Sequence, residues 1–242
     1  MSTSSSLAGL KTFDGLNIEY ERAYHNNPFK KSCIKTAISL LPAQSHVLDV
    51  GCGTGVPVSE MLSSAGLEVV GFDISPKMVE LAASRIKGTF AVSDMLTYQP
   101  ENTFAGVFMI FSHLQLHYAD FHAVCWKFAK TLQPGGLFVI GQMPSDKYVP
   151  TDSPAYDEDK TYVEDYDTPF MGEPLPTFMM SSERQRSFLR SMGFEIVSET
   201  IDMFQPENEK CEPEEQQYII AKRVDESEVQ PPRPLPREVR NS

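Results

Sequence analysis

The sequence contains few cysteines, no cysteine motif and no long apolar run. Four cysteines are scattered along the chain and none forms a C-x-x-C pair, so neither a zinc site nor a disulfide framework is indicated. No apolar run approaches the roughly 20 residues of a membrane-spanning helix. The N-terminus lacks the basic start and apolar core of a signal peptide. We therefore expect a cytoplasmic protein with reduced thiols and no membrane partner.

Positive charge is also scarce. The 242 residues include 21 Lys and Arg against 33 Asp and Glu, which gives a net charge of −12. Binding to nucleic-acid phosphates requires clustered Lys and Arg, so this composition argues against a nucleic-acid partner. The 41% of hydrophobic residues is enough to bury the core of one sizeable domain. The same acidity argues against binding to an anionic membrane surface.

Short apolar runs alternate with amphipathic helical stretches from residue 46 onward. The expected strands are 46–50, 68–73, 89–94, 106–111 and 137–142, followed by a closing pair at 194–201 and 215–223. Helices are expected between them, for example over 57–65 and 120–132. Alternation at this spacing predicts an α/β fold with a doubly wound, mostly parallel sheet, here of seven strands.

The remaining segments suggest how the chain is organised. Residues 1–14 are polar and are expected to be loose, and 15–222 form the domain. Residues 16–41 contain two helical stretches separated by "NNP". Residues 144–180 interrupt the alternation, and within them 144–174 hold nine acids, two lysines and four tyrosines. The tail 223–242 lacks a core-forming pattern and is expected to be disordered, although "PPRPLPR" within it resembles an SH3-type ligand.

The stretch "VLDVGCGTG" at residues 47–55 places a glycine-rich turn directly after the first strand. Such a turn usually cradles a cofactor. A dinucleotide-binding turn has the form G-x-G-x-x-G, but its third glycine is replaced here by Val56, and the glycines are Gly51, Gly53 and Gly55. This spacing disfavours a nicotinamide cofactor, which stays the weakest alternative.

Acids follow at the ends of the next two strands. Asp73 ends the second strand, where a carboxylate can accept hydrogen bonds from both ribose hydroxyls. Asp94 ends the third strand, where it can accept from an adenine amino group. Ile74 and Met95 could hold the purine between apolar side chains. Because open α/β sheets bind ligands at the carboxyl ends of their strands, these residues are expected to meet the glycine turn.

Taken together, these stretches resemble the class I S-adenosylmethionine (SAM) dependent methyltransferases. The resemblance rests on "VLDVGCGTG", "VVGFDIS", "AVSDM", "FSHLQLHYAD" and "LQPGGLFVIGQM", and covers roughly residues 15–222. It implies SAM as the cofactor, with the glycine turn near its methionine part, Asp73 on the ribose and Asp94 on the adenine. Asp49 matches the acid of the motif, which usually braces the loop beside the cofactor's amino group. The chain departs from the family at Ala105, where an acid is common.

The segment after the fourth strand is expected to approach the transferred methyl group. Phe111 should lie near that group, and His113 and His117 are the candidate general bases because histidine titrates near neutral pH. A histidine satisfied by local contacts is the competing interpretation for both. The resemblance also implies that Tyr20, with Tyr24, belongs to a helical lid over the cofactor, although a packing role is equally possible.

The expected activity is methyl transfer from SAM to a small organic acceptor, with a hydroxyl oxygen favoured and a specialised (natural-product) metabolite as the substrate class. Residues 144–174 would form the acceptor pocket; their tyrosines could form an aromatic wall and their acids could favour a neutral or cationic acceptor. No metal is expected, and the protein is expected to be a monomer or homodimer. Two alternatives remain open: a SAM-binding protein that catalyses a non-methylating step such as a cyclisation, and a regulatory module acting through the tail.

Overall fold

The computed structural model describes residues 4–224 and 228–236. The helices are α1 Ser4–Tyr24, α2 Pro28–Leu40, α3 Val58–Ser64, α4 Pro76–Arg85, α5 Tyr118–Ala129, α6 Ser145–Tyr148 and α7 Ser182–Ser191. The strands are β1 His46–Val50, β2 Glu68–Asp73, β3 Thr89–Val92, β4 Phe104–Ile110, β5 Leu132–Gln142, β6 Tyr162–Phe170, β7 Glu173–Met180, β8 Phe194–Phe204 and β9 Glu214–Arg223. No described helix is long and apolar enough to cross a membrane.

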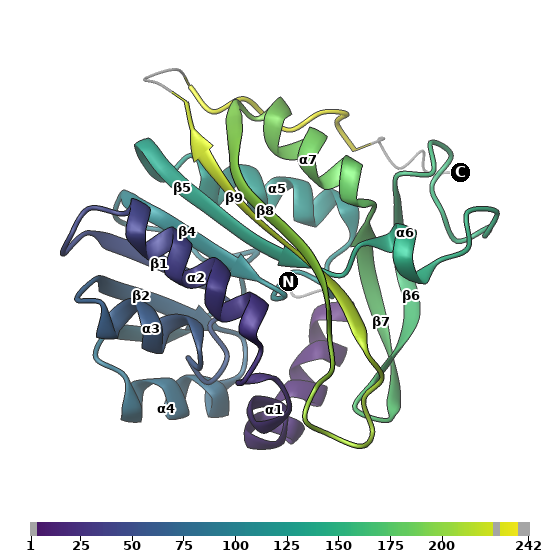
Figure 1. Ribbon diagram of the computed structural model, residues 1–242, viewed down its shortest axis with the longest axis horizontal. Coiled ribbons are helices and arrows are strands. Elements are labelled where there is room, and N and C mark those ends of the chain that lie inside the picture. Colours follow the sequence, from purple (N-terminus) through teal and green to yellow (C-terminus); the bar gives the residue numbers. More distant parts are fainter. Residues whose placement is uncertain (1–3, 225–227, 237–242) are drawn as a thin grey trace.

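Seven strands form one sheet in the order β3-β2-β1-β4-β5-β9-β8 (Figure 1). The pairs from β3 to β5 are parallel, and β9 runs antiparallel to both β5 and β8. The predicted seven-stranded, mostly parallel α/β sheet is therefore confirmed. Because β1 and β4 are adjacent but not consecutive, the strand order reverses between them, and their carboxyl ends open the crevice where such sheets bind ligands.

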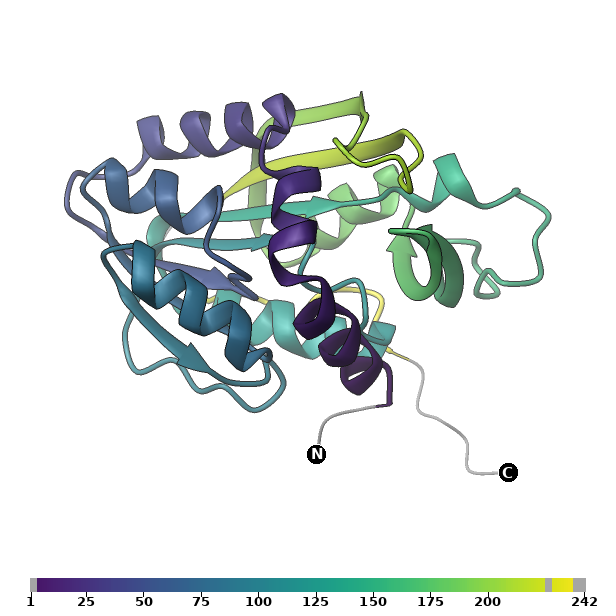
Figure 2. The ribbon, with the colours of Figure 1, turned by 90° about the horizontal axis from the view of Figure 1, so that it is seen from below.

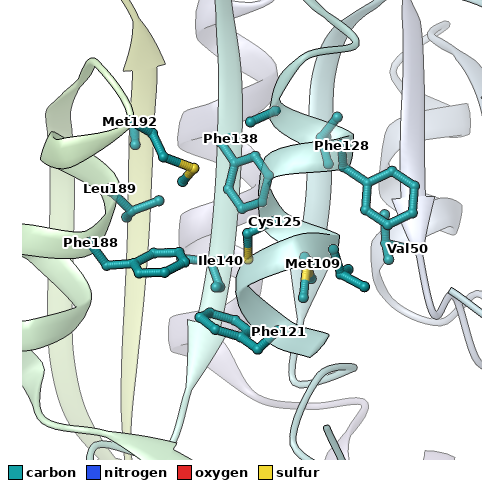
Figure 3. Packing of buried hydrophobic residues seen from close by; sticks show 14 of the residues in the cluster. Val50, Met109, Phe121, Cys125, Phe128, Phe138, Ile140, Phe188, Leu189 and Met192 are labelled. Atoms are coloured by element: carbon teal, nitrogen blue, oxygen red, sulfur yellow. The ribbon is translucent and has the colours of Figure 1, made fainter. Parts of the chain in front are cut away.

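Helices cover both faces of the sheet (Figure 2). On one face, α5 and α7 bury a core of large side chains against β4 and β5, including Phe121, Phe128, Phe138 and Phe188 (Figure 3). The opposite face is covered by α2 and α3, whose Ile34 and Leu62 belong to a second core cluster. Burial on both faces explains why β4 reads as a nearly continuous apolar run.

The N-terminal helix begins much earlier than expected. We expected residues 1–14 to be loose, but from Ser4 the chain is already helical, and α1 continues to Tyr24 with a non-helical break at Asn17. Tertiary contacts stabilise this polar stretch. The Asp14 carboxylate accepts from Ser75 Oγ at 2.9 Å and pairs with Lys77 Nζ at 2.9 Å, both at the start of α4. Residues 1–3 lie outside the described part of the chain.

The segment after β5 forms a two-stranded antiparallel sheet, β6-β7, which is separate from the seven-stranded sheet (Figure 1). Its tyrosines do not form the expected wall of an acceptor pocket. Tyr162 stacks on Tyr118 at 4.4 Å between ring centroids, and Tyr148 donates to the Glu215 carbonyl at 2.7 Å. Tyr156 and Tyr166 pack around the Val149 cluster. These rings stabilise the hairpin because each finds its partner outside the crevice.

The tail is ordered where the structure describes it. We expected disorder over 223–242, but residues 228–236 lie along α5 and α7. Carbonyls of this segment accept from Tyr118 Oη at 2.6 Å and from Trp126 Nε1 at 3.3 Å, and Val229 is buried in the core. His122 Nε2 lies 2.6 Å from the Pro232 carbonyl oxygen. The amino-acid composition could not predict these contacts, because they depend on the surface that α5 and α7 form. We also expected disorder at 225–227 and 237–242, and these residues lie outside the described part of the chain.

Candidate cofactor and acceptor site

The glycine turn after β1 lines a cavity of about 110 Å³ at the carboxyl ends of the strands. Gly51 and Gly53 line it, with φ angles of 68° and 54° that L side chains rarely adopt. A Cβ on Gly51 would lie 2.4 Å from Ser112 Cβ, so the turn approaches the segment after β4 closely. At Gly53, apart from the glycine and its two chain neighbours, no atom of the described chain lies within 4 Å of the Cβ position. The turn therefore leaves open space for a ligand.

Gly55 has a different role. It does not line the cavity, and a Cβ there would lie 2.3 Å from Ile86 Cδ1 and 3.3 Å from Ala82 Cβ. The expected cofactor contact is therefore not found. Gly55 instead allows the turn to pack closely against the C-terminal part of α4.

Asp73 joins two of the strand ends. Its carboxylate accepts from the Gly53 backbone N–H at 2.9 Å and from the Ser75 backbone N–H at 2.9 Å, and it lines the cavity. Burial raises its pKa, and the backbone hydrogen bonds oppose this shift. Each carboxylate oxygen keeps a further lone pair. Asp73 can therefore accept hydrogen bonds from a ligand in the cavity.

The third strand end completes this side of the cavity. Asp94, Met95 and Ile74 line it as expected, and Asp94 Oδ1 accepts from the Leu96 backbone N–H at 2.9 Å. Ser112, expected with Phe111 near the methyl group, lines it too. Further residues that line it are Gly9, Leu10, Phe13, Phe72, Met78, Ser93, Ile110, Gln115 and Leu116. Ser112 Oγ is buried and has no hydrogen-bond partner in the described chain. The cavity thus combines an apolar slot with carboxylates and an unpartnered hydroxyl.

Asp49 lies beneath the turn rather than in the cavity wall. It is buried, accepts from Ser59 Oγ at 2.6 Å and does not line the cavity. Burial raises the pKa of its carboxyl group to about 7. Asp49 therefore braces β1 against α3, as expected for the acid of this motif, and its carboxyl group does not itself line the cavity.

The two halves of α1 close the cavity from outside. Phe13 and Tyr20 line it from either side of the break at Asn17, and their rings meet edge to face at 5.5 Å between centroids. Tyr20 is thus found where a lid residue was expected. Burial raises its pKa, so its hydroxyl stays protonated.

A second, smaller cavity of about 30 Å³ adjoins the first, and both are lined by Phe13, Tyr20, Phe111 and Gln115. Its other lining residues are Tyr24, Lys30, Leu114, Met143, Thr168, Phe170, Leu175, Thr177, Glu214 and Gln216. The β6-β7 hairpin therefore does contribute to this cavity. The hairpin contributes apolar groups and hydroxyls to this cavity. None of the acids of 144–174 lines either cavity.

Phe111 separates the two cavities. Its φ of 58° is unusual for a bulky residue and costs about 1–2 kcal/mol. The conformation is held by the Phe111 N–H donating to the Gly141 carbonyl at 3.0 Å and by an edge contact with Tyr218 at 5.5 Å between centroids. This backbone turn lets one ring form a wall of both cavities.

Neither candidate histidine lines a cavity in the described chain. His113 is fully buried against Phe121, at 4.9 Å between centroids, and burial lowers its pKa to about 3. His117 precedes α5 and lies 3.7 Å from Glu164 and 3.9 Å from Asp165. The structure therefore does not bring either expected base to the reacting position: His113 points into the core and His117 toward the β6-β7 hairpin.

Comparison with known proteins identifies the fold. Residues 47–136 match a family model described as a methyltransferase domain. The magnesium protoporphyrin IX methyltransferase of Synechocystis PCC 6803 with bound SAM superposes with a TM-score of 0.62 at 16% identity, over 92% of this chain and 99% of that one. Residues 47–136 therefore match a methyltransferase domain, and they lie within a fold like that of a SAM-dependent methyltransferase.

Two curated fungal proteins match this methyltransferase domain. The O-methyltransferase cnsE of Penicillium expansum is 29% identical over 69% of this chain and 58% of its own length. The sterol 24-C-methyltransferase of Kluyveromyces lactis is 30% identical over 63% of this chain and 41% of its own length. The chain therefore spans about half the length of the curated relatives it matches.

The cavity of the methyltransferase domain fits SAM. Gly53 offers open space beside the backbone, Asp73 offers lone pairs for a ribose, and Ile74 and Met95 offer an apolar slot beside Asp94. Of the ten residues predicted to hold the cofactor, the cavity gathers all but Asp49 and Gly55.

The polar residues of the second cavity were not recognised from the sequence. Lys30 lay in an expected amphipathic helix, Gln216 lay in an expected strand, and Glu214 lay just before that strand. A signal was present, because Glu214, Gln216 and Tyr218 alternate on one side of β9, where Gln216 and Tyr218 are buried. Three polar residues with period two in a buried strand indicate a polar site on that face.

Proposed function

We propose that this protein transfers a methyl group from SAM to a hydroxyl oxygen of a small organic acceptor, and that this acceptor is a specialised metabolite. One observation carries the proposal: the two cavities share the walls formed by Phe13, Tyr20, Phe111 and Gln115. A ligand in the smaller cavity would therefore lie beside the reactive end of a cofactor in the larger one. The relationship to an O-methyltransferase supports the oxygen as acceptor atom.

SAM, when bound, supplies a methyl group on a positively charged sulfur, which is already an activated electrophile. The contribution of the chain is then mainly positioning and exclusion of water. Asp73 would hold the ribose and Asp94 the adenine amino group, with Ile74 and Met95 on either side of the purine. Gly51 and Gly53 would pass beneath the methionine part of the cofactor.

The smaller cavity would orient the acceptor. Phe170 and Leu175 provide apolar walls, and Thr168 and Thr177 provide hydroxyls that lie 2.7 Å apart. Tyr20 covers the junction of the cavities, which excludes water from the reacting atoms. Apolar walls with a few placed polar groups are typical of small-molecule sites.

The test is incubation with SAM labelled in its methyl group and a panel of phenols, enols and amines, with products separated by chromatography. We expect label on a hydroxyl oxygen and formation of S-adenosylhomocysteine in equal amount. Asp73→Ala is the control for protein-dependent transfer. A product that forms without label would establish the non-methylating alternative, and label on nitrogen or carbon would overturn the choice of oxygen.

We also propose that the protein acts in the cytoplasm as a monomer or homodimer, and not on nucleic acid. The net charge of −12 supports the last point, because phosphate backbones repel an acidic protein. Light scattering after size exclusion would give the oligomeric state. A trimer or larger assembly would contradict the proposal, as would micromolar binding to duplex DNA at physiological salt.

A further inference from the structure

Lys30 is a buried lysine at the junction of the two cavities. It lies in the first turn of α2, where the Asn27 side chain caps the helix by accepting from the backbone N–H groups of Phe29 and Lys30 at 3.0 and 2.9 Å. Only 5% of Lys30 is exposed, and its side chain lines the second cavity. Nζ lies 5.4 Å from the centre of the Phe111 ring.

The charge of Lys30 lacks a hydrogen-bonding partner. Within the described chain its Nζ makes no hydrogen bond or ion pair, and it lies 5.4 Å from the centre of the Phe111 ring and 5.9 Å from that of Tyr24. Burying an ammonium group without hydrogen bonds is costly, and such groups are normally paired. A cation in this position has donors directed at whatever occupies the cavity.

The Glu214 carboxylate, which could otherwise pair with Lys30, already accepts hydrogen bonds from other residues. Tyr24 Oη donates to Glu214 Oε1, and Gln216 Nε2 donates to Glu214 Oε2 at 2.8 Å. Asn27 Nδ2 in turn donates to Gln216 Oε1 at 2.6 Å. This network connects α1, α2 and β9. It fixes the wall around Lys30 but leaves the lysine donors for a ligand.

Burial lowers the pKa of Lys30 to about 8, and the acids Glu214 from β9 and Asp49 from β1 oppose the shift. Tyr24 and Tyr20 face the same region from α1, and burial raises the pKa of both hydroxyls. The Lys30 amine can therefore be neutral close to neutral pH, whereas the hydroxyl groups of Tyr20 and Tyr24 stay protonated.

We propose that Lys30 is the acceptor-binding group of this site, and that it takes the proton of a phenolic or enolic hydroxyl. The O–H proton moves to the neutral Nζ, which leaves an oxyanion paired with the ammonium group. The proton later passes to solvent. This inference rests on the proposed function and deepens it by naming the acceptor class.

The surroundings of Lys30 favour this class over the alternatives. A cationic amine would be repelled by the ammonium group in a water-poor site. A flat aromatic acceptor would meet the rings of Phe13, Tyr20 and Phe170, which line the same cavity. The carboxylate of the cofactor is the rival partner for the lysine, but Lys30 does not line the larger cavity.

The test uses p-nitrophenol, whose ionised form is followed by its absorbance, added to the protein saturated with S-adenosylhomocysteine. Wild type should bind the phenolate and lower the pKa of the bound probe relative to the free probe. Lys30→Met should weaken binding about 10- to 100-fold, the loss expected for a hydrogen bond to a charged group. Lys35→Met is the matched control, because Lys35 is an exposed residue of the same helix.

A second variant separates anion binding from proton transfer. Lys30→Arg keeps a cation that cannot lose its proton, so it should bind p-nitrophenolate yet abolish the rise of kcat/KM for phenols as pH increases through about 8. Thermal unfolding confirms that each variant is folded.

The outcomes are distinct. Unchanged p-nitrophenol binding by Lys30→Met would overturn the inference, as would failure of wild type to bind the probe. Loss of S-adenosylhomocysteine affinity in Lys30→Met, measured by calorimetry, would assign the lysine to the cofactor carboxylate and overturn it too. If wild type binds phenolate through Lys30 but transfers no methyl group, the proposed function fails while the binding site stands.

Discussion

Replacing Gly53 by alanine should weaken the cofactor far more than it weakens the fold. With φ at 54°, the new side chain costs about 1–2 kcal/mol of folding stability. Apart from the glycine and its two chain neighbours, no atom of the described chain lies within 4 Å of the Cβ position, so no clash adds to this cost. The methyl group of the new alanine would occupy space at the cavity wall, where the cofactor must come close to the protein backbone. We expect affinity for S-adenosylhomocysteine to fall at least tenfold, which corresponds to about 1.4 kcal/mol.

Gly66→Ala provides the matched control for this prediction. Gly66 has a φ of 82°, also has open space within 4 Å among the described atoms, and does not line the cavity. Both variants should therefore lose similar stability by chemical denaturation, while only Gly53→Ala loses affinity by calorimetry. Equal S-adenosylhomocysteine affinity in the two variants and wild type would refute the placement of the cofactor against this turn.

Three further outcomes follow from burial. Since folded Asp49 holds a proton up to about pH 7 that the unfolded chain releases near 3.8, the free energy of unfolding should fall as pH rises across this range, by at most about 4 kcal/mol. Asp49→Asn should lack this pH-dependent part of the free energy of unfolding. If the free energy of unfolding changes with pH in the same way in wild type and Asp49→Asn, the prediction is wrong. His113→Leu should be neutral or stabilising, because His113 has no hydrogen-bond partner in the described chain, and His117→Ala should keep most activity. A 10²- to 10⁴-fold loss in either variant would restore a base role. Truncation after Arg223 should destabilise the domain by about 2 kcal/mol or more, since it removes the buried Val229; an unchanged melting temperature would show that the tail contacts contribute nothing.

The sequence predicted the parts of this site that depend on local geometry. A strand followed by Gly51 and Gly53 can turn in only a few ways. Parallel strands bring their carboxyl ends to one edge of the sheet, so Asp73 and Asp94 could be placed there from spacing alone. The mostly parallel sheet followed from the same alternation. These inferences needed no knowledge of side-chain packing.

Side-chain direction was the part that spacing could not predict. His113 follows a residue that lines the cavity, yet it points into the core, because the chain after β4 turns sharply at Phe111. Lys30 and Glu214 are 184 positions apart and meet only because α2 packs near the end of β9. The helical start of α1 and the order of residues 228–236 likewise depend on surfaces provided by distant elements.

The broken helix α1 makes the two cavities thermodynamically dependent on each other. Phe13 and Tyr20 lie on opposite sides of Asn17, and both form walls shared by the two cavities. A ligand in either cavity would contact these two rings, so we expect the first ligand to fix side chains that the second ligand also meets. Linkage then requires that the acceptor tighten the cofactor by the same factor by which the cofactor tightens the acceptor. Steady-state kinetics should accordingly show synergistic rather than independent saturation by the two substrates.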